Sequence, residues 1–323
     1  MEADIQQMSR QLPQQNTYTQ RIAPTPLAPV QLDSGGPVIW CKLDFLNPSG
    51  STKDRIARYI LEKAWRDGRI GPGTTVIEAS SGSTSIAMAL ACAQLGIRFV
   101  AVMPEGISNE RALIIRGYGG EIRFTSKEEG VRGAIAETRR LAAQGPAVFL
   151  PCQFSNPENS EAHRHGTAKE ILDQIPGGSV DAVVSGVGTG GTLVGLFQGF
   201  SDAGCPVVPV YARPVDLSGP PDAECCSYSS RIPGVVESIS TIFCSEALPG
   251  LETIEIRDHD AIEATRHLIR RGFSVGPSSG LNYCAAVVAA RMLGSGARVV
   301  TVFPDRMDRY FTTELFRPMR ECV

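Results

Sequence analysis

The stretch VVSGVGTGGTLVGL, residues 183–196, holds the strand-to-helix junction on which the fold assignment depends. An apolar run enters a glycine-rich loop, and a helical pattern starts near Thr192. Glycines let a backbone approach a phosphate closely, and the N–H groups and dipole of the following helix attract the dianion. The loop glycines are Gly186, Gly188, Gly190 and Gly191. The stretch therefore predicts a phosphate-binding loop at the end of a strand.

The same loop nearly matches the dinucleotide-binding pattern G-x-G-x-x-G, which requires an acidic residue about 20 positions later to hold a ribose hydroxyl. The next predicted strand ends at Arg213 instead. This mismatch weakens the interpretation as an NAD site. An NADP site that uses Arg213 stays open as an alternative.

Short apolar runs alternate with amphipathic stretches from residue 38 onward. Strands are predicted at 38–43, 74–79, 98–104, 121–125, 147–154, 181–186, 206–212, 274–278 and 297–304. Helices are predicted at 54–66, 86–96, 109–119 and 131–145, with others between most of the later strands. Strands that alternate with helices of ~10–15 residues indicate parallel βαβ units. We therefore predict an α/β fold of mostly parallel sheets covered by helices.

Two stretches interrupt this alternation. The expected seam between two domains lies near 145–160, where the turn residues of FSNPENSE, 154–161, break the pattern. The irregular stretch 213–234 is too long for a routine connection and is expected to be a functional loop.

The composition narrows the possible function classes. Of the 323 residues, 31 are Lys or Arg and 34 are Asp or Glu, which gives a net charge of -3. Neither sign forms a long run, so we do not expect a nucleic-acid partner. No apolar run reaches the ~18 residues that span a bilayer, so we do not expect a membrane partner either.

The N-terminus and the cysteines bear on the cellular location. Residues 1–20 lack the cationic start and apolar block of a secretory signal, and their many glutamines predict a disordered leader. The 9 cysteines include no C-x-x-C pair, so free thiols in a reducing cytoplasm are the simplest explanation. His163 and His165 are expected on different faces of one helix. We therefore predict a cytoplasmic protein without a metal site.

Lys53 is the candidate nucleophile. It follows the turn-forming residues NPSGST, 47–52, and precedes a helical stripe that includes Ile56 and Ile60. The dipole at a helix N-terminus disfavours a cation, so an amine there loses its proton more easily. A neutral amine is a nucleophile. A solvated surface lysine is the alternative interpretation.

Two further junctions carry hydroxyl groups. The loop 80–85 has five hydroxyls and Gly82 ahead of a helix expected near Ile86, and it can present hydroxyl and N–H groups to a carboxylate. Ordinary N-capping explains only one or two of these hydroxyls. In FSVGPSSG, 273–280, Ser278 or Ser279 is expected either to cap the next helix or to offer a neutral hydrogen bond to a ring nitrogen.

Taken in order, the four junctions resemble those of the fold-type II pyridoxal-phosphate enzymes of the cysteine synthase (O-acetylserine sulfhydrylase) and cystathionine β-synthase group. The similar segments are NPSGSTKDRIA (47–57) for the cofactor lysine, SSGSTS (80–85) for the substrate loop, GVGTGGT (186–192) for the phosphate cup and GPSSG (276–280) for the ring nitrogen. The resemblance covers about residues 25–316. It implies a two-domain, tryptophan synthase β-like fold with pyridoxal 5′-phosphate as cofactor.

The resemblance also implies roles for individual residues. Lys53 would form the Schiff base and then act as general base. The implied cofactor-binding residues are Lys53, Ser83, Gly188, Thr189, Gly190, Gly191, Thr192 and Ser278. The implied substrate-binding residues are Ser80, Ser81, Gly82, Thr84 and Gln153, the last in QFSNPEN (153–159).

The implied activity is β-replacement on an activated L-serine, O-acetylserine or O-phosphoserine, through an aminoacrylate, which gives cysteine or a related β-substituted alanine. The candidate nucleophiles are sulfide, thiosulfate and an amine, the last in a diaminopropionate-type synthase. β-Elimination of the cysteine desulfhydrase or serine dehydratase type and a non-catalytic homologue are the alternatives. The resemblance further implies a homodimer, with a smaller mobile domain at 45–150 and a larger cofactor-binding domain formed by 21–44 and 151–323.

Some positions depart from the family pattern. Ser83 replaces an asparagine that contacts the ring oxygen of the cofactor, and Ser85 replaces a glycine and is expected to add bulk near the substrate. Arg164 and His165 are expected either to attract an anionic leaving group or nucleophile, or to lie at the surface. These departures argue against assuming plain sulfide as the second substrate.

Overall fold

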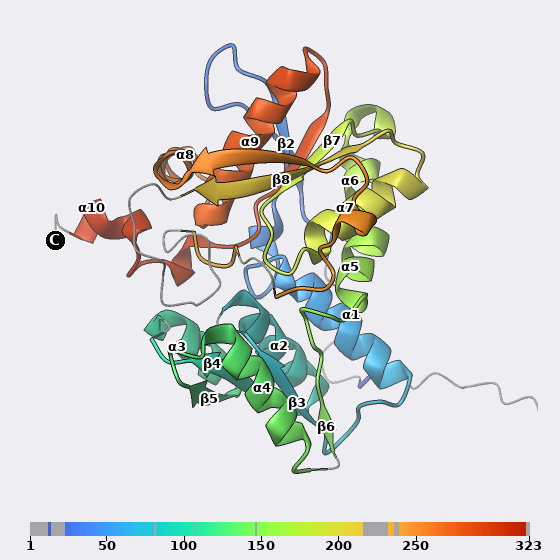
Figure 1. Cartoon of the computed structure of the whole chain (residues 1–323), viewed down its shortest axis with the longest axis vertical. Coiled ribbons are helices and arrows are strands. Elements are labelled where there is room, and N and C mark those ends of the chain that lie inside the picture. Colours follow the sequence, from blue (N-terminus) through green and yellow to red (C-terminus); the bar gives the residue numbers. More distant parts are fainter. Residues whose placement is uncertain are drawn as a thin grey trace, which may run out of the picture.

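Two β-sheets organise the chain in the computed structural model (Figure 1). The structure describes residues 12–13, 23–80, 82–106, 108–145, 147–215, 232–235 and 239–320. The larger sheet has the strand order β1-β2-β10-β7-β8-β9. Its strands are β1 (Leu27–Val30), β2 (Ile39–Lys42), β7 (Ala182–Ser185), β8 (Val208–Val215), β9 (Glu252–Arg257) and β10 (Val299–Val302). All neighbours in this sheet are parallel except β1 and β2, which are antiparallel.

Helices cover both faces of the larger sheet. One face packs against α8 (Asp258–Arg270) and α9 (Pro277–Leu293), and the other against α6 (Ala168–Gln174) and α7 (Gly191–Asp202). Along β7, Val184 belongs to the first core cluster, whereas Val183 belongs to the second. A parallel strand between two helix layers requires apolar residues on both sides, as the sequence predicts.

The smaller sheet has the strand order β5-β4-β3-β6, and all its neighbours are parallel. Its strands are β3 (Thr75–Ala79), β4 (Arg98–Pro104), β5 (Glu121–Thr125) and β6 (Val148–Phe149). The helices around it are α1 (Lys53–Arg66), α2 (Ser83–Leu95), α3 (Asn109–Gly117) and α4 (Gly130–Ala142). The side of β3 that carries Val76 packs against α1, α2 and α3, whereas the side that carries Ile77 packs against α4. The predicted α/β class with mostly parallel sheets is confirmed.

Helices α1 and α5 (Glu158–Ala162) lie between the two sheets (Figure 1). The hydroxyl of Tyr59 on α1 donates a hydrogen bond to Glu161 Oε2 on α5 at 3.1 Å. A π-helical turn, His163–Thr167, joins α5 to α6. The remaining short helices are Asp44–Leu46, Pro176–Gly178, Ser245–Ala247, Met307–Arg309, Glu314–Phe316 and α10 (Arg317–Arg320).

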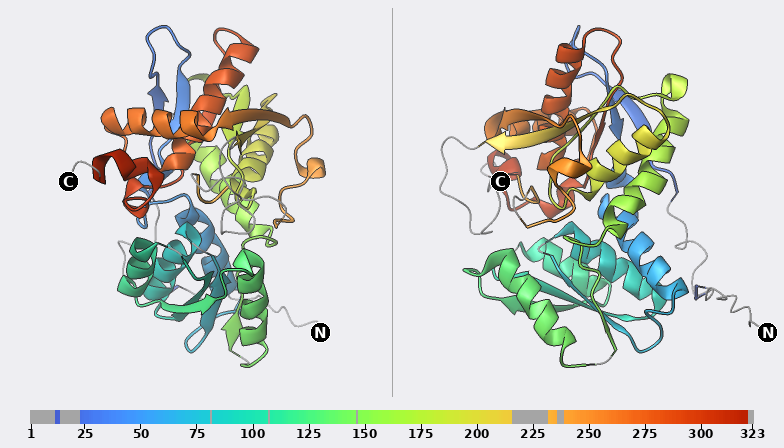
Figure 2. Two further views of the ribbon diagram at one scale, coloured as in Figure 1. Left: turned by 60° about the vertical axis from the view of Figure 1, so that its left-hand side comes forward. Right: turned by 45° about the vertical axis from the view of Figure 1, so that its right-hand side comes forward.

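The strands of the two sheets come from separate parts of the chain. Strands between residues 75 and 149 form the smaller sheet, and those at 27–42 and 182–302 form the larger one. Figure 2 shows the corresponding halves from two further directions. The domain boundaries at 45–150 and at 21–44 plus 151–323 remain a prediction.

Several expectations fall outside the described residues. The predicted leader, residues 1–20, lies outside the described residues except for residues 12 and 13. Most of the predicted functional loop, residues 216–231, lies outside them too. Within the described ranges, no helix has the length and apolar character needed to cross a membrane.

Two predicted strands differ from the structure, and two observed strands, β1 and β9, were not predicted. Residues 274–278 are not a strand, since Val275 makes a single bridge and α9 already starts at Pro277. The predicted strand 147–154 is reduced to β6. Pro151 has no N–H for a sheet, and Cys152 turns the chain with a φ of 54°.

Candidate active site

A pocket lies where the carboxyl ends of β3, β7 and β10 face the N-termini of α1, α2, α7 and α9. Ligands of open parallel sheets bind at such positions. All four predicted junctions meet here. The predicted site residues that line the pocket are Lys53, Ser80, Gly82, Ser83, Thr84, Gln153, Gly188, Thr189, Gly190, Thr192 and Ser278. Gly191 is buried beside the lining residues, and Ser81 lies outside the described residues.

Lys53 is the first residue of α1, as predicted. Asp54 stabilises the preceding turn, because its carboxylate accepts hydrogen bonds from Ser49 N at 2.9 Å and from the Ser49 hydroxyl at 2.5 Å. The Lys53 side chain is half-buried and lines the pocket. Burial lowers the pKa of its amine, and the carboxylates of Asp305 and Asp44 act in the opposite direction. The pocket therefore contains an amine whose neutral form is favoured by desolvation.

The glycine loop before α7 is packed too closely for side chains. A Cβ at Gly188 would lie 2.5 Å from Gly234 O, and a Cβ at Gly190 would lie 2.5 Å from the Cβ of Phe243. Gly190 also has a φ of 81°, which favours glycine. The first N–H groups of α7, which have no acceptor within the helix, and its dipole form a site for an anion.

Two threonine hydroxyls of this loop are held by residues around α5. Thr189 Oγ1 accepts a hydrogen bond from Asn159 Nδ2 at 2.9 Å. Thr192 Oγ1 lies 3.2 Å from His163 Nε2, and His163 Nδ1 lies 2.9 Å from Thr167 Oγ1. Burial lowers the pKa of His163 to about 3, so its imidazole is neutral near pH 7.

The hydroxyl loop after β3 is connected to Gln153. Thr84 donates a hydrogen bond from Oγ1 to Gln153 Oε1 at 2.6 Å, and Gln153 Nε2 donates to Ala79 O at 2.8 Å. Ser80 Oγ accepts a hydrogen bond from Gly82 N at 3.2 Å. The loop and Gln153 thus form one polar wall of the pocket.

Ser83 contacts the segment that follows β10. Its hydroxyl donates to Asp305 Oδ2 at 3.1 Å and accepts from Arg309 Nη1 at 3.1 Å. Tyr310 also donates to Asp305 Oδ2, at 2.6 Å. Arg309, 1% exposed, donates to the carbonyl oxygens of Ser49 and Gly50. The hydroxyl at position 83 therefore belongs to a buried network that reaches the lysine turn.

Ser278 lies in the first turn of α9 and lines the pocket. One turn later, Asn282 accepts a hydrogen bond from Gly186 N at 2.7 Å and donates to Val302 O at 2.8 Å. Asn282 thereby fixes the glycine loop and the end of β10 relative to Ser278.

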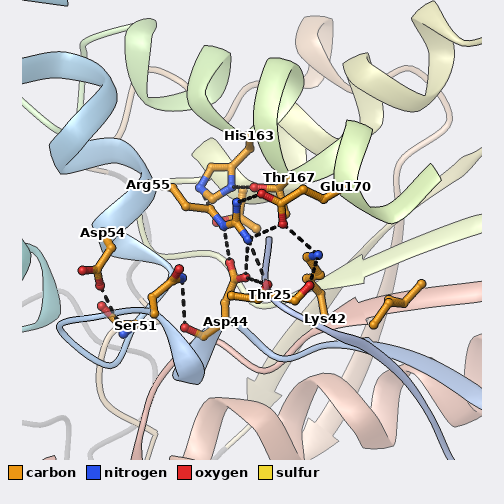
Figure 3. Close-up of polar contacts among 12 residues, drawn as sticks. Thr25, Lys42, Asp44, Ser51, Asp54, Arg55, His163, Thr167 and Glu170 are labelled. Carbon is orange, nitrogen blue, oxygen red and sulfur yellow. Dashed lines mark hydrogen bonds and ion pairs between the residues drawn. The ribbon is translucent and has the colours of Figure 1, made fainter. Parts of the chain in front are cut away.

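A buried ionic network fixes the start of α1 (Figure 3). Arg55, two residues after Lys53, pairs with Asp44 at 2.8 Å and with Glu170 at 2.7 Å. Lys42, 0% exposed, pairs with Glu170 at 2.8 Å and donates to Thr25 O at 2.5 Å. Burial of Asp44 raises its pKa, but the charge and hydrogen bonds of Arg55 outweigh burial and lower the pKa to about 2. The network connects β2, α1 and α6 next to the pocket.

The positions that depart from the family pattern lie mostly away from the pocket. Ser85 is fully buried, donates to Ser80 O at 2.9 Å and does not line the pocket, so its side chain adds no bulk to the pocket surface itself. Arg164 pairs with Asp202 at 2.6 Å, and His165 is exposed. The structure therefore agrees with the expectation that Arg164 and His165 lie at the surface, not with the expectation that they attract an anion to the pocket.

Sequence reasoning missed several lining residues, namely Thr52, Arg111, Asn282, Asp305 and Tyr310. Asp305 had a usable signal, because a charged residue directly after an apolar strand of a parallel sheet lies at the ligand-binding edge. Arg111 had none, because only the folded chain brings α3 to this pocket.

Comparisons with known proteins agree with this geometry. A family model described as pyridoxal-phosphate dependent enzyme matches residues 18–305. A cysteine synthase of Staphylococcus aureus is 36% identical over 315 residues, which cover 93% of this chain and 97% of that protein. An O-acetylserine dependent cystathionine β-synthase from Helicobacter pylori matches with a TM-score of 0.82 and 32% identity over 93% of this chain and 98% of its own. An O-ureido-L-serine synthase matches with a TM-score of 0.82 and 30% identity, and the match covers 94% of this chain and 96% of that protein.

Proposed function

The chain belongs to the pyridoxal-phosphate dependent enzyme family, and we propose that it catalyses β-replacement on O-acetyl-L-serine, which gives cysteine or a related β-substituted alanine. The observation that carries this proposal is that four strand–loop–helix junctions meet around Lys53 in one pocket. The cysteine synthase of Staphylococcus aureus and the O-acetylserine dependent enzyme of Helicobacter pylori support the substrate class.

The pocket residues fit pyridoxal 5′-phosphate. A Cβ at Gly188 would overlap Gly234 O and a Cβ at Gly190 would overlap the Cβ of Phe243, so this loop conformation requires glycine. The start of α7 behind it suits a phosphate, because its first N–H groups and its dipole attract an anion. Thr52 Oγ1 is a buried atom without a hydrogen-bond partner in the described part of the chain, and Thr52 lines the pocket. We assign the phosphate to residues 188–192, including Gly191, the aldehyde carbon to Lys53 and the ring nitrogen to Ser278.

Lys53 carries the proton transfers in this proposal. When bound, the cofactor supplies an electron sink for bond changes at the α- and β-carbons of the amino acid. Lys53 Nζ takes the proton from the α-carbon, for which its lowered pKa is suited. Acetate leaves the β-carbon, the nucleophile adds its electron pair there, and Lys53 Nζ returns the proton to the α-carbon.

The other residues bind and orient. Ser80, Ser81, Gly82, Thr84 and Gln153 are assigned to the substrate carboxylate. The hydroxyl of Ser278 offers a neutral hydrogen bond to the ring nitrogen. Ser83 is assigned to the side of the ring near Asp305, to which it donates a hydrogen bond.

The test is a product analysis with the cofactor-loaded protein. O-Acetyl-L-serine and O-phospho-L-serine are each incubated with sulfide, thiosulfate and a panel of amines and thiols, and mass spectrometry identifies the products. We expect a β-substituted alanine with at least one nucleophile. Lys53→Ala should lower the rate by about 10³-fold or more while the protein stays folded. Release of pyruvate alone, without any substituted alanine, would overturn the proposal in favour of β-elimination.

We also propose a homodimer in the cytoplasm with a smaller mobile domain at 45–150. Six cysteines in the described part of the chain are free thiols, which supports a reducing compartment. Light scattering of the loaded protein tests the homodimer.

A further inference from the structure

Glu78 is a buried carboxyl group that none of the assigned roles uses. It lies in β3, next to the last residue of the strand, and is 3% exposed. Its Oε1 accepts a hydrogen bond from Ala79 N at 2.9 Å, and its Oε2 accepts one from Gln153 N at 3.1 Å. The N–H of Cys152 is a third hydrogen-bond donor to this carboxyl group. Three backbone donors around one side chain indicate a site shaped for the acceptor oxygens of a carboxyl group.

Glu78 lies where the hydrogen-bonded ladder between β3 and β6 has already ended. The ladder between β3 and β6 ends at the pair Val76 and Phe149. Beyond it the backbone at 152–153 has no strand partner in β3, and the carboxyl oxygens of Glu78 accept its N–H groups instead. Cys152 has a φ of 54°, the sole positive value at a non-glycine residue among the described ones. Such a residue turns successive N–H groups toward one anion.

The same short segment of β3 and α2 holds the side chain of Gln153. Its Nε2 donates to Ala79 O, and its Oε1 accepts from Thr84. Because a backbone carbonyl can only accept, this contact fixes which end of the amide is the nitrogen. An amide nitrogen carries two N–H groups, and the contact with Ala79 uses one of them. Gln153 lines the pocket, so the second N–H is available to a ligand there.

We propose that Glu78 is a positioning residue for the substrate: its carboxyl oxygens fix the backbone of residues 152–153, so that the Gln153 amide is pre-oriented toward the carboxylate of the amino acid. This inference rests on the proposed function. Glu78 does not touch the substrate and acts through Gln153. Its replacement should therefore weaken substrate binding and leave the chemistry at Lys53 nearly unchanged.

The test is a double-mutant cycle in the cofactor-loaded enzyme with Glu78→Gln, Gln153→Ala and the pair. Glu78→Gln keeps the shape but turns an NH₂ group toward backbone donors. We expect KM for O-acetyl-L-serine to rise by up to about tenfold, as for one lost hydrogen bond, with kcat nearly unchanged. The double variant should be no worse than Gln153→Ala alone. Additive effects, or a loss in kcat alone, would overturn the proposal.

Two controls separate positioning from loss of structure. Glu137→Gln on α4, where the carboxylate pairs with Arg140 away from the pocket, should leave KM unchanged. Glu78→Asp keeps the carboxyl group but withdraws it by one methylene, and it replaces Glu78→Gln if that variant does not fold. It too should raise KM without lowering kcat, and an unchanged KM would overturn the proposal.

A binding measurement keeps this inference separate from the proposed function. L-Serine lacks the acetyl leaving group, and its binding to the loaded protein is followed by the visible absorbance of the cofactor. Glu78→Gln should weaken this binding by up to about tenfold even if O-acetyl-L-serine is not turned over. Unchanged L-serine affinity in Glu78→Gln would overturn the role of Glu78. If the wild-type protein binds L-serine but does not turn over O-acetyl-L-serine with any nucleophile, the proposed reaction is overturned instead.

Discussion

Ser83 shows what a single substitution in a family motif does to the surrounding contacts. The family asparagine contacts the ring oxygen of the cofactor, but the Ser83 hydroxyl is held between Asp305 and Arg309. A hydroxyl has one hydrogen to donate, and that of Ser83 is donated to Asp305 Oδ2 at 3.1 Å. The residue therefore stabilises the contact between the start of α2 and the segment after β10.

Ser83→Ala should cost about 1 kcal/mol in the free energy of unfolding, the usual contribution of a hydrogen bond. It should leave the absorption maximum of the bound cofactor unchanged, because the hydroxyl is donated to Asp305. Ser85→Ala is the matched control, since Ser85 makes a single buried hydrogen bond to Ser80 O. Urea unfolding and a visible spectrum check both variants. A shifted maximum in Ser83→Ala alone would instead indicate that the hydroxyl donates to the ring.

At single residues, the sequence was informative where local chemistry is unusual. Lys53 and the glycines of 186–192 stand out because a cation at a helix start and a run of glycines are both rare without a ligand. Glu78 and Asn282 gave no such signal. Each acts through a backbone group distant in sequence, such as Gln153 N for Glu78 and Val302 O for Asn282. Such partners become visible only in the folded chain.

At the scale of one element, α7 offers a matched pair of glycines. Gly190, just before the helix, has a φ of 81°, and Gly204, just after it, has a φ of 78°. A Cβ at Gly190 would lie 2.5 Å from the Cβ of Phe243, whereas nothing lies within 4 Å of a Cβ at Gly204. Both alanine variants carry the same backbone cost, and only one adds a steric overlap.

Gly204→Ala should destabilise the protein by about 1 kcal/mol, the cost of a left-handed conformation for a residue with a Cβ. Gly190→Ala should cost about 1–3 kcal/mol more because of overpacking. It should also weaken cofactor binding, since the loop must move away from Phe243. Chemical unfolding and equilibrium dialysis of the cofactor measure the two effects. Equal costs for the two variants would contradict the assigned packing.

Element prediction succeeded where apolar periodicity was strong and failed at irregular strands. β4 and β5 agree with the predicted ranges to the residue. β6 is shorter than predicted because the strand cannot continue through the next residues. Pro151 has no N–H for a sheet hydrogen bond, and Cys152 has a positive φ that turns the chain. β9 was missed because its alternation of exposed and buried residues differs from the continuous apolar runs of the central strands.

At the scale of the whole molecule, two buried groups with opposite pKa shifts contribute to stability as a function of pH. Burial raises the pKa of Glu78 to about 8, and burial lowers the pKa of His163 to about 3. Their ordinary values are 4.5 and 6.5. Stability rises with pH wherever the unfolded chain binds more protons than the folded one, and falls in the opposite case.

The balance of protons defines three ranges. Between about pH 3 and 4.5, the unfolded chain holds both protons and the folded chain holds only that of Glu78, so stability rises with pH. Between about 4.5 and 6.5, each state holds one proton, on His163 when unfolded and on Glu78 when folded, so the two effects cancel. Between about 6.5 and 8, only the folded chain holds a proton, so stability falls as pH rises.

The free energy of unfolding should therefore show a plateau near pH 4.5–6.5 and decrease above it by about 1.4 kcal/mol per pH unit. Urea unfolding from pH 4 to 8 measures this profile. Glu78→Gln removes the group that titrates above the plateau, so its profile should stay flat from pH 6.5 to 8. His163→Gln removes the compensating proton of the unfolded state, so its stability should already fall from pH 4.5 upward. A wild-type profile that stays flat between pH 6.5 and 8 would mean that the three N–H donors outweigh burial at Glu78 and that the group is ionised throughout this range.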